Sequence, residues 1–137
     1  MNETLSWFSA ILYKDFVLYT KDQLRELGLS YGALPFLLYV GKHPGCTPTE
    51  LTRAIHMDGG HTQRTIARLR EGGFLSNEKA GRTHHLHLTA AGEEAFAASH
   101  RVFGEWDAQR LAGLTEEERT QLMALLGKVK KGVQVHE

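Results

Sequence analysis

The chain has 137 residues, of which 42% are hydrophobic and 23% are charged. This composition is ordinary for a folded domain and excludes a chain that is disordered throughout. Sixteen Lys and Arg balance sixteen Asp and Glu, and a zero net charge argues against a protein that binds nucleic acid through a broad basic surface. One Cys cannot form an internal disulfide, no apolar run reaches the length of a membrane span, and the first residues lack a signal-peptide pattern. We therefore expect a cytoplasmic protein that contacts no membrane.

The first quarter of the chain predicts two helices. Apolar residues between 5 and 27 recur at spacings of three and four, which favours one long helix, and Gly28 is expected to end it. A second apolar segment runs from residue 30 to 40 and contains Pro35. Because proline is poorly tolerated inside a helix, this helix either starts late, near Ala33, or bends. Residues 42–45 have the composition of a turn.

Two short helices and a hairpin are expected next. Thr47, Pro48 and Glu50 form a capping-box sequence that starts a short helix, and Asp58 is a good N-cap for a second one that ends near Arg70. Residues 74–79 are extended in character, residues 80–82 form a turn, and residues 83–88 alternate between apolar and polar. Two short helices followed by a hairpin are typical of a winged helix-turn-helix, whose second short helix enters the major groove.

The last third of the chain again has helical spacing. A helix is expected after Thr89, and Thr115 and Glu118 form a second capping box before the final helix. We predict a mainly α fold with a small β-hairpin wing. Residues 30–89 form the winged helix-turn-helix, with the helix-turn-helix at about 47–71 and the wing at about 74–88. Residues 1–29 and 90–137, rich in aromatic side chains, form a helical dimerisation region.

The zero net charge hides an uneven distribution. Residues 42–90 contain seven Lys and Arg against four Asp and Glu, a net charge of +3, so the remainder carries −3. Six of the eight His also fall in this central region. The split matters only if the basic residues share one face of the fold.

Helical spacing groups polar side chains on one side of the second short helix. His61, Arg64, Thr65 and Arg68 share that side with Gln63 beside them, while Thr62, Ile66 and Leu69 fall on the other and are expected to pack inward. Arg and Gln can pair with base edges, backbone amides near Gly60 can hold a phosphate, and a basic hairpin tip can enter a minor groove. A merely solvated helix face would also be polar. The candidate DNA-binding residues are Gly60, His61, Thr62, Gln63, Arg64, Thr65, Arg68, Lys79 and Arg82.

Several stretches together resemble the MarR family of bacterial transcription regulators. They are ThrProThrGluLeuThrArgAlaIle (47–55), the helix sequence of residues 64–75, LeuHisLeuThrAlaAlaGly (86–92) and LeuThrGluGluGluArg (114–119). The resemblance implies a homodimer whose first and last helices interleave and whose recognition helices enter successive major grooves of double-stranded DNA. By position, it assigns Arg64 and Arg68 to DNA contact and Arg82 to the wing.

The chain departs from the family pattern at two places. The family wing usually reads Asp-Arg-Arg, where this chain has Ala80, Gly81 and Arg82. The recognition helix has Gly60 and His61 where small hydroxyl residues are common. Both changes remove expected DNA contacts, so we expect an altered operator preference or weaker DNA binding.

Many relatives release DNA when a small aromatic or phenolic acid binds between the dimer helices and the winged domain. The residues of this chain that could line such a crevice are Trp7, Ile11, Leu38, His43 and Phe103, although each one alone is more simply a core residue. The lone Cys46 is expected to be inert. The His residues lack metal-ligand spacing, so no metal or other cofactor is expected.

The function expected from these patterns is sequence-specific regulation of transcription by a homodimer, as a repressor on a palindromic site. The alternative is a winged-helix module that binds another protein and binds DNA weakly or not at all. The reduced wing and the zero net charge support that alternative. No arrangement of residues suggests catalysis, so we do not expect an enzyme.

Overall fold

The computed structural model describes residues 3–133, and residues 1–2 and 134–137 of the predicted dimerisation region lie outside this range. The elements follow the expected order, mainly α with one β-hairpin, which confirms the predicted fold class. They are α1 (Leu5–Glu26), a 3-10 turn (Tyr31–Ala33), α2 (Leu34–Lys42), α3 (Pro48–Ile55), α4 (Gly59–Glu71), β1 (Leu75–Ala80), β2 (Thr83–Leu88), α5 (Ala90–Arg110) and α6 (Glu116–Lys130).

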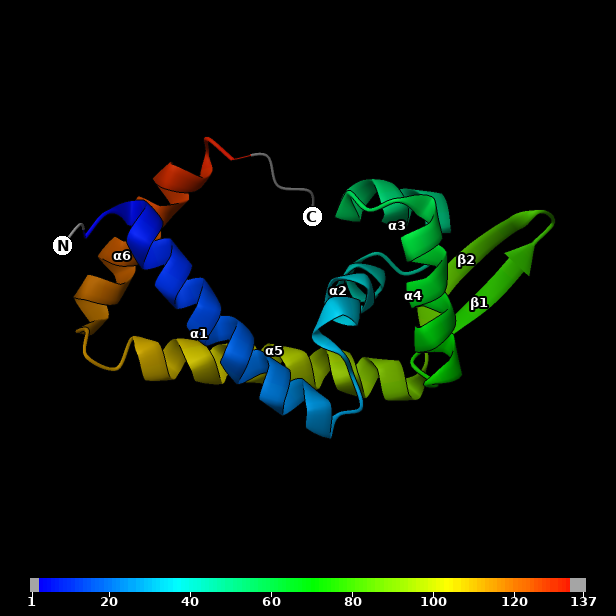
Figure 1. The fold of residues 1–137 in the computed structure, drawn as a ribbon, viewed down its shortest axis with the longest axis horizontal. Coiled ribbons are helices and arrows are strands. Elements are labelled where there is room, and N and C mark those ends of the chain that lie inside the picture. The colour runs from blue at the N-terminus through cyan, green and yellow to red at the C-terminus, as the bar shows by residue number, and fades with distance from the viewer. Residues whose placement is uncertain (1–2, 134–137) are drawn as a thin grey trace.

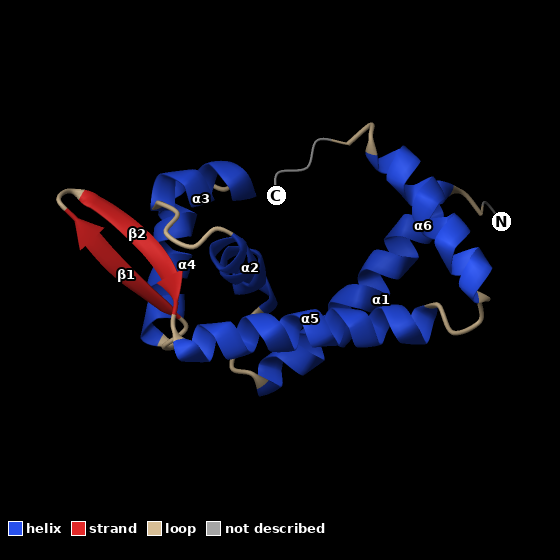
Figure 2. Cartoon of the chain, turned by 180° about the vertical axis from the view of Figure 1, so that it is seen from behind, coloured by secondary structure: helices blue, strands red, loops and turns tan. Residues whose placement is uncertain are grey.

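The chain is elongated, with α5 as its spine (Figure 1). One end of α5 carries α2, α3, α4 and the hairpin, which together we call the winged module. Helix α1 crosses α5 diagonally, and its N-terminal half lies beside α6 at the other end (Figures 1 and 2). The DNA-binding candidates therefore lie at one end of the protomer, and α6 with the N-terminal half of α1 lies at the other (Figure 1).

Side-chain caps start the helices as expected. Thr47 and Asp58 accept the backbone N–H of Glu50 (3.1 Å) and His61 (2.7 Å). Thr115 and Glu118 form both bonds of a capping box, whereas at Thr47 the structure shows the bond from the Glu50 N–H and not the reciprocal one. Such caps fix where each helix begins because they satisfy amides that have no partner inside the helix.

Pro35 lies at the start of α2, after the 3-10 turn at Tyr31–Ala33. Of the two alternatives, the late start is therefore the correct one. Proline costs little there, because the first helical residues have no N–H acceptor within the helix.

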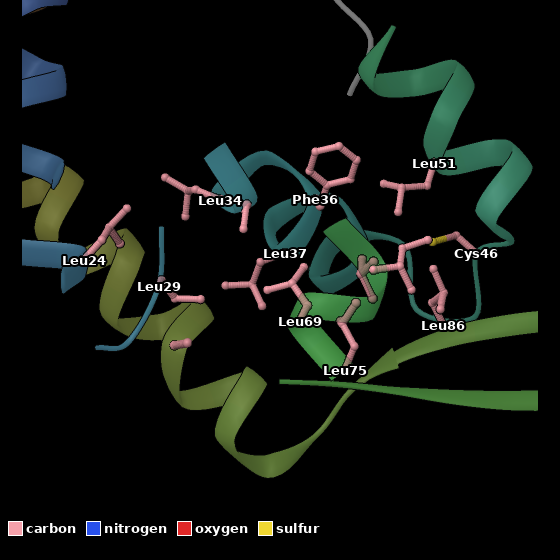
Figure 3. Packing of buried hydrophobic residues seen from close by; sticks show 14 residues of the cluster. Leu24, Leu29, Leu34, Phe36, Leu37, Cys46, Leu51, Leu69, Leu75 and Leu86 are labelled. Atoms are coloured by element: carbon pink, nitrogen blue, oxygen red, sulfur yellow. The ribbon is translucent and has the colours of Figure 1, made fainter. Parts of the chain in front are cut away.

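The buried core lies in the winged module and its junction with α5 (Figure 3). Phe36 and Leu37 of α2, Leu69 of α4 and Leu86 of the hairpin belong to one cluster, and all are nearly or fully buried. Gly92 of α5 allows the closest approach, because a Cβ there would lie 2.1 Å from the Phe74 carbonyl oxygen. This packing fixes the hairpin and α4 relative to the spine.

The hairpin is antiparallel, with Leu75 opposite Leu88 and Ala80 opposite Thr83. Its base is bonded to the loop between α2 and α3. The Gly45 N–H donates to the Leu86 oxygen (2.8 Å), and the Leu86 N–H donates to the Cys46 oxygen (2.9 Å). The His85 Nδ1 donates to the Gly45 oxygen (2.9 Å), since a carbonyl can only accept. These bonds hold the wing beside α4.

At the other end, one acidic residue joins α1 to α5. The Asp15 carboxylate accepts hydrogen bonds from the Trp106 Nε1 (2.8 Å) and from the Arg110 guanidinium (3.1 Å at Nη2). The Phe16 ring contacts the rings of Phe103 and Trp106, with centroids 5.5 and 5.2 Å apart. Among the described helices, none combines the length and apolar character that a bilayer crossing needs.

Candidate nucleic-acid interface

The inner side of α4 includes Thr65 in addition to Thr62, Ile66 and Leu69, the three residues expected to pack inward. Thr62 is fully buried and Thr65 is 3% exposed, next to the buried Ile66 and Leu69. The Thr62 hydroxyl donates to the Asp58 oxygen (3.1 Å) and the Thr65 hydroxyl to the His61 oxygen (2.9 Å). The assignment of Thr62 and Thr65 to DNA contact is therefore wrong. Both belong to the row of residues, spaced i, i+3 and i+7, by which α4 packs against the rest of the winged module. Their hydroxyls are hydrogen-bonded within α4.

The outer side of α4 carries three of the predicted residues, Gln63, Arg64 and Arg68, all exposed. Gly60 is also exposed, at the helix start. Ala67 and Glu71 are also exposed on this side of α4, although neither was predicted to contact DNA. The outer side is thus polar and cationic along most of its length, with one methyl group at Ala67 and one carboxylate at Glu71.

His61 lies at the edge of this surface. It is half-buried, and its ring faces the ring of Phe36 with centroids 5.8 Å apart. The His61 ring therefore packs α4 against α2, and only part of it is accessible to a ligand.

Arg64 folds back over the first turn of α4. A Cβ built on Gly60 would lie 3.3 Å from the Arg64 Nη1 and 3.3 Å from the Asp58 Oδ1. The hydrogen bond from the His61 N–H lowers the pKa of Asp58, burial opposes this, and the Arg64 charge lowers it further. Gly60 thus leaves space for a guanidinium beside a carboxylate that stays ionised at neutral pH.

The wing places Lys79 and Arg82 at its exposed tip, on either side of Ala80 and Gly81. Gly81 has a φ of +64°, a conformation that glycine adopts without strain. Lower down, the Asn77 Nδ2 donates to the His84 Nδ1 (2.6 Å), which ties the two strands together.

A groove of about 620 Å³ separates the wing from α4. Arg70 and Glu71 line it from α4, and Ser76 and Asn77 line it from β1. Exposed residues of α4 and the wing therefore share one face of the module.

A second depression, of about 320 Å³, lies between α3 and the start of α4. It is lined by Pro48, Thr49, Thr52, Arg53, Gly59 and Gln63. Arg53 and Thr49 were not among the residues predicted to contact DNA. Their spacing of four on a short helix indicates one shared face, but only the crossing of α3 and α4 brings that face to Gln63.

The five candidate effector residues do not come together in one chain. Trp7 and Ile11 lie in the half of α1 beside α6, whereas Leu38 and His43 lie on α2 and at its end, in the winged module (Figures 1 and 2). A pocket of about 460 Å³ beside the N-terminal half of α5 is lined by Leu27, Phe74 and other residues, but by none of the five. The predicted crevice is therefore not formed within a protomer, because α1 diverges from α2 as it crosses α5.

Cys46 is 3% exposed, and burial, followed by the charge of Glu50, raises the pKa of its thiol to about 11. Few thiolates exist at neutral pH, so this thiol is poorly suited to sensing oxidants. Residues 3–133 contain no group of three His, Cys, Asp or Glu placed to hold a metal ion.

Comparison with known proteins identifies relatives over the full length of the chain. A MarR family model matches residues 27–83. The HTH-type transcriptional regulator BilQ of Clostridium symbiosum (strain WAL-14163) is 39% identical over 139 aligned residues, which cover 99% of this chain and 96% of the relative. The regulator of the same name from Clostridioides difficile (strain CD3) is 30% identical, over 93% of this chain and 88% of the relative.

Solved structures share the fold. A crystal structure of MarR superposes with a TM-score of 0.82 at 26% identity and covers 96% of this chain and 93% of its own. A putative MarR family regulator from Listeria monocytogenes, solved in complex with a 26mer DNA, has a TM-score of 0.75 at 22% identity, over 97% and 90% of the two chains. Both BilQ relatives are HTH-type transcriptional regulators. The chain belongs to the MarR family of winged helix-turn-helix transcriptional regulators, which bind DNA.

Proposed function

We propose that the chain acts in the cytoplasm as a homodimer that represses transcription by binding a palindromic duplex site. The observation that carries this proposal is the exposed outer side of α4, where Gln63, Arg64 and Arg68 project from a helix held by a buried inner side. Arg pairs bidentately with guanine and Gln with adenine in the major groove. The polar atoms on this surface therefore suit base recognition.

The wing supports the same docking. With α4 in the major groove, Lys79 and Arg82 at the wing tip reach toward the adjacent minor groove, where the potential is most negative. The DNA backbone that separates the major groove from the minor groove then passes between α4 and β1. There it lies in the protein groove lined by Arg70 and Ser76.

The terminal helices support a dimer. Helix α6 buries none of its side chains in the single chain. Large apolar side chains are exposed on α1 and α6, a surface that marks an interaction site: Leu5, Phe8, Ile11, Leu12, Tyr13, Leu18, Met123, Leu125, Leu126 and Val129. A two-fold dimer would cover them and present two copies of α4 to half-sites about one helical turn apart.

Few basic residues are available for phosphate contact. The net charge is zero, and the wing tip has glycine at the position where the family pattern has its first arginine. Non-specific attraction is therefore weak, and affinity depends on the two copies of α4 binding together.

Release by a small aromatic or phenolic ligand is the proposed mode of regulation. In the single chain Leu38 lies on α2, His43 follows the end of that helix, and Phe103 lies on α5. Trp7 and Ile11 could take part only through the dimer. The ligand shifts the equilibrium between the DNA-binding form and the other form of the protein only through a difference in affinity. It must therefore have the higher affinity for the form that does not bind DNA. Salicylate and related phenolic acids, tested for a raised melting temperature and a lowered DNA affinity, check this part of the proposal.

The test of DNA recognition uses the full-length protein and a randomised duplex library. Repeated selection should enrich a two-fold symmetric sequence, and affinity for it should fall steeply as KCl rises. Sedimentation should show two protomers on each duplex. A library that yields no sequence, or binding indifferent to salt, would contradict the proposal and favour a winged helix that binds protein.

A further inference from the structure

Ala67 is an apolar side chain among hydrogen-bonding groups on the outer side of α4. At about 100° per residue, it lies about 160° around the helix from the buried Leu69, so its methyl group points away from the winged module. Its neighbours one helical turn away on the same side are the exposed Gln63, Arg64 and Glu71. These neighbours can read a base by hydrogen bonds, whereas a methyl group can read one only by an apolar contact.

The Ala67 methyl group is not covered by the long side chains near it. The Arg64 guanidinium lies over the first turn of α4, where its Nη1 is 3.3 Å from a Cβ built on Gly60. Arg64 therefore extends toward the start of the helix, and Ala67 remains exposed one turn further along. A partner that approaches the outer side of α4 meets this methyl group directly.

Ala67 also lies at the edge of the groove between α4 and the wing, together with Arg70 of α4 and Ser76 of β1. In the proposed docking, this groove holds the DNA backbone beside the major groove. The Ala67 methyl group then lies where a base edge meets the backbone of its own strand. On an A·T pair, the group at that place in the major groove is the C5-methyl group of thymine.

We propose that Ala67 is a specificity-determining residue that selects an A·T pair in each half-site, through contact of its methyl group with the thymine C5-methyl group. The proposal rests on the proposed function, since it requires α4 to lie in a major groove. Residues 64 and 67 are about 4.5 Å apart along the helix axis, and base pairs are about 3.4 Å apart. The thymine should therefore lie within about two base pairs of the pair that Arg64 reads.

The experiment uses the full-length protein and the duplex selected from the randomised library. Each thymine is replaced in turn, in both half-sites, by deoxyuridine, which pairs with adenine in the same way and lacks only the C5-methyl group. At one position the wild type should bind the deoxyuridine duplex roughly fourfold more weakly per half-site, because a buried methyl group is lost. Ala67→Gly should bind the two duplexes equally at that position.

Each protein is compared with itself on two duplexes, so the loss of helix stability that glycine causes cancels in the ratio of the two affinities. Ala97→Gly removes an exposed methyl group from α5 and is the matched control, which should keep the wild-type ratio. Equal binding of the wild type to every deoxyuridine duplex would overturn the proposal, as would an undiminished preference for thymine in Ala67→Gly. A library that enriches no sequence would instead overturn the proposed function, so the two failures are distinguishable.

Discussion

The two ends of the molecule differ in how they keep apolar side chains from water. In the winged module, Phe36, Leu37, Leu51 and Leu86 are fully buried. In α6, Leu125 is 59% exposed, and none of the residues of that helix is buried. The winged module therefore carries its own core, whereas the terminal helices need a partner to cover theirs. This difference predicts that substitutions at one end act on folding and at the other on association.

The largest effect is expected in the module core. Phe36→Ala removes a fully buried ring between α2 and α4 and should cost about 3–5 kcal/mol of unfolding free energy. Urea unfolding followed by circular dichroism measures it. Leu125→Ala, at the exposed end, should change the unfolding of a monomeric sample by less than about 0.5 kcal/mol. Equal effects of the two substitutions would remove the contrast between the two ends.

The thiol of Cys46 tests whether the loop between α2 and α3 stays closed. Because burial raises its pKa to about 11, only about one thiol in a thousand is ionised at pH 8. Reaction of the native protein with a disulfide reagent at pH 8 should be at least about a hundredfold slower than that of the urea-unfolded chain. Similar rates in both states would mean that the wing base opens readily.

The terminal helices should control association. Leu125→Asp places a charge in the apolar surface of α6 and should raise the dimer dissociation constant by roughly tenfold or more, because a buried unpaired charge is costly. Analytical ultracentrifugation gives this constant. The far-ultraviolet circular dichroism of the protein should stay close to that of the wild type, because the winged module stays folded. A dimer as tight as the wild type would place the interface elsewhere.

The smallest effect is expected from Asp15, which joins α1 to α5 and contributes to the stability of the fold. Hydrogen bonds from Arg110 and Trp106 lower its pKa in the folded chain. A lowered pKa stabilises the fold above the ordinary value of 3.8, and this stabilisation is lost as the pH falls through the folded-state pKa. Asp15→Asn should lower the melting temperature slightly at pH 7 and reduce its fall below pH 4. If the melting temperatures of the two proteins fall by the same amount between pH 7 and pH 2.5, this role of Asp15 is contradicted.

Local sequence signals predicted most of the fold. The caps at Thr47, Asp58 and Thr115 act on their own first turns, so neighbouring residues suffice to place these helix starts. Pro35 left two alternatives open, and only the structure shows that α2 starts late.

The site was predicted less completely, because it depends on how helices pack. Thr65 lies between the inner and outer sides of α4, and spacing alone assigned it to the wrong one. Arg53 was not among the predicted site residues, because only the crossing of α3 and α4 places it beside Gln63. The effector candidates were grouped as the lining of a crevice between the dimer helices and the winged domain, whereas in one protomer the N-terminal half of α1 lies away from α2 (Figure 1). Helix crossing angles arise from contacts between distant segments, which a single sequence does not display.

The most direct measurement of the central claim compares wild-type protein with Arg64→Ala on the selected duplex and on variants that change one base pair at a time. If α4 reads bases, Arg64→Ala should lose about 1–3 kcal/mol on the selected duplex and become indifferent to at least one base pair in each half-site. Unchanged affinity together with unchanged discrimination at every base pair would contradict base reading by α4.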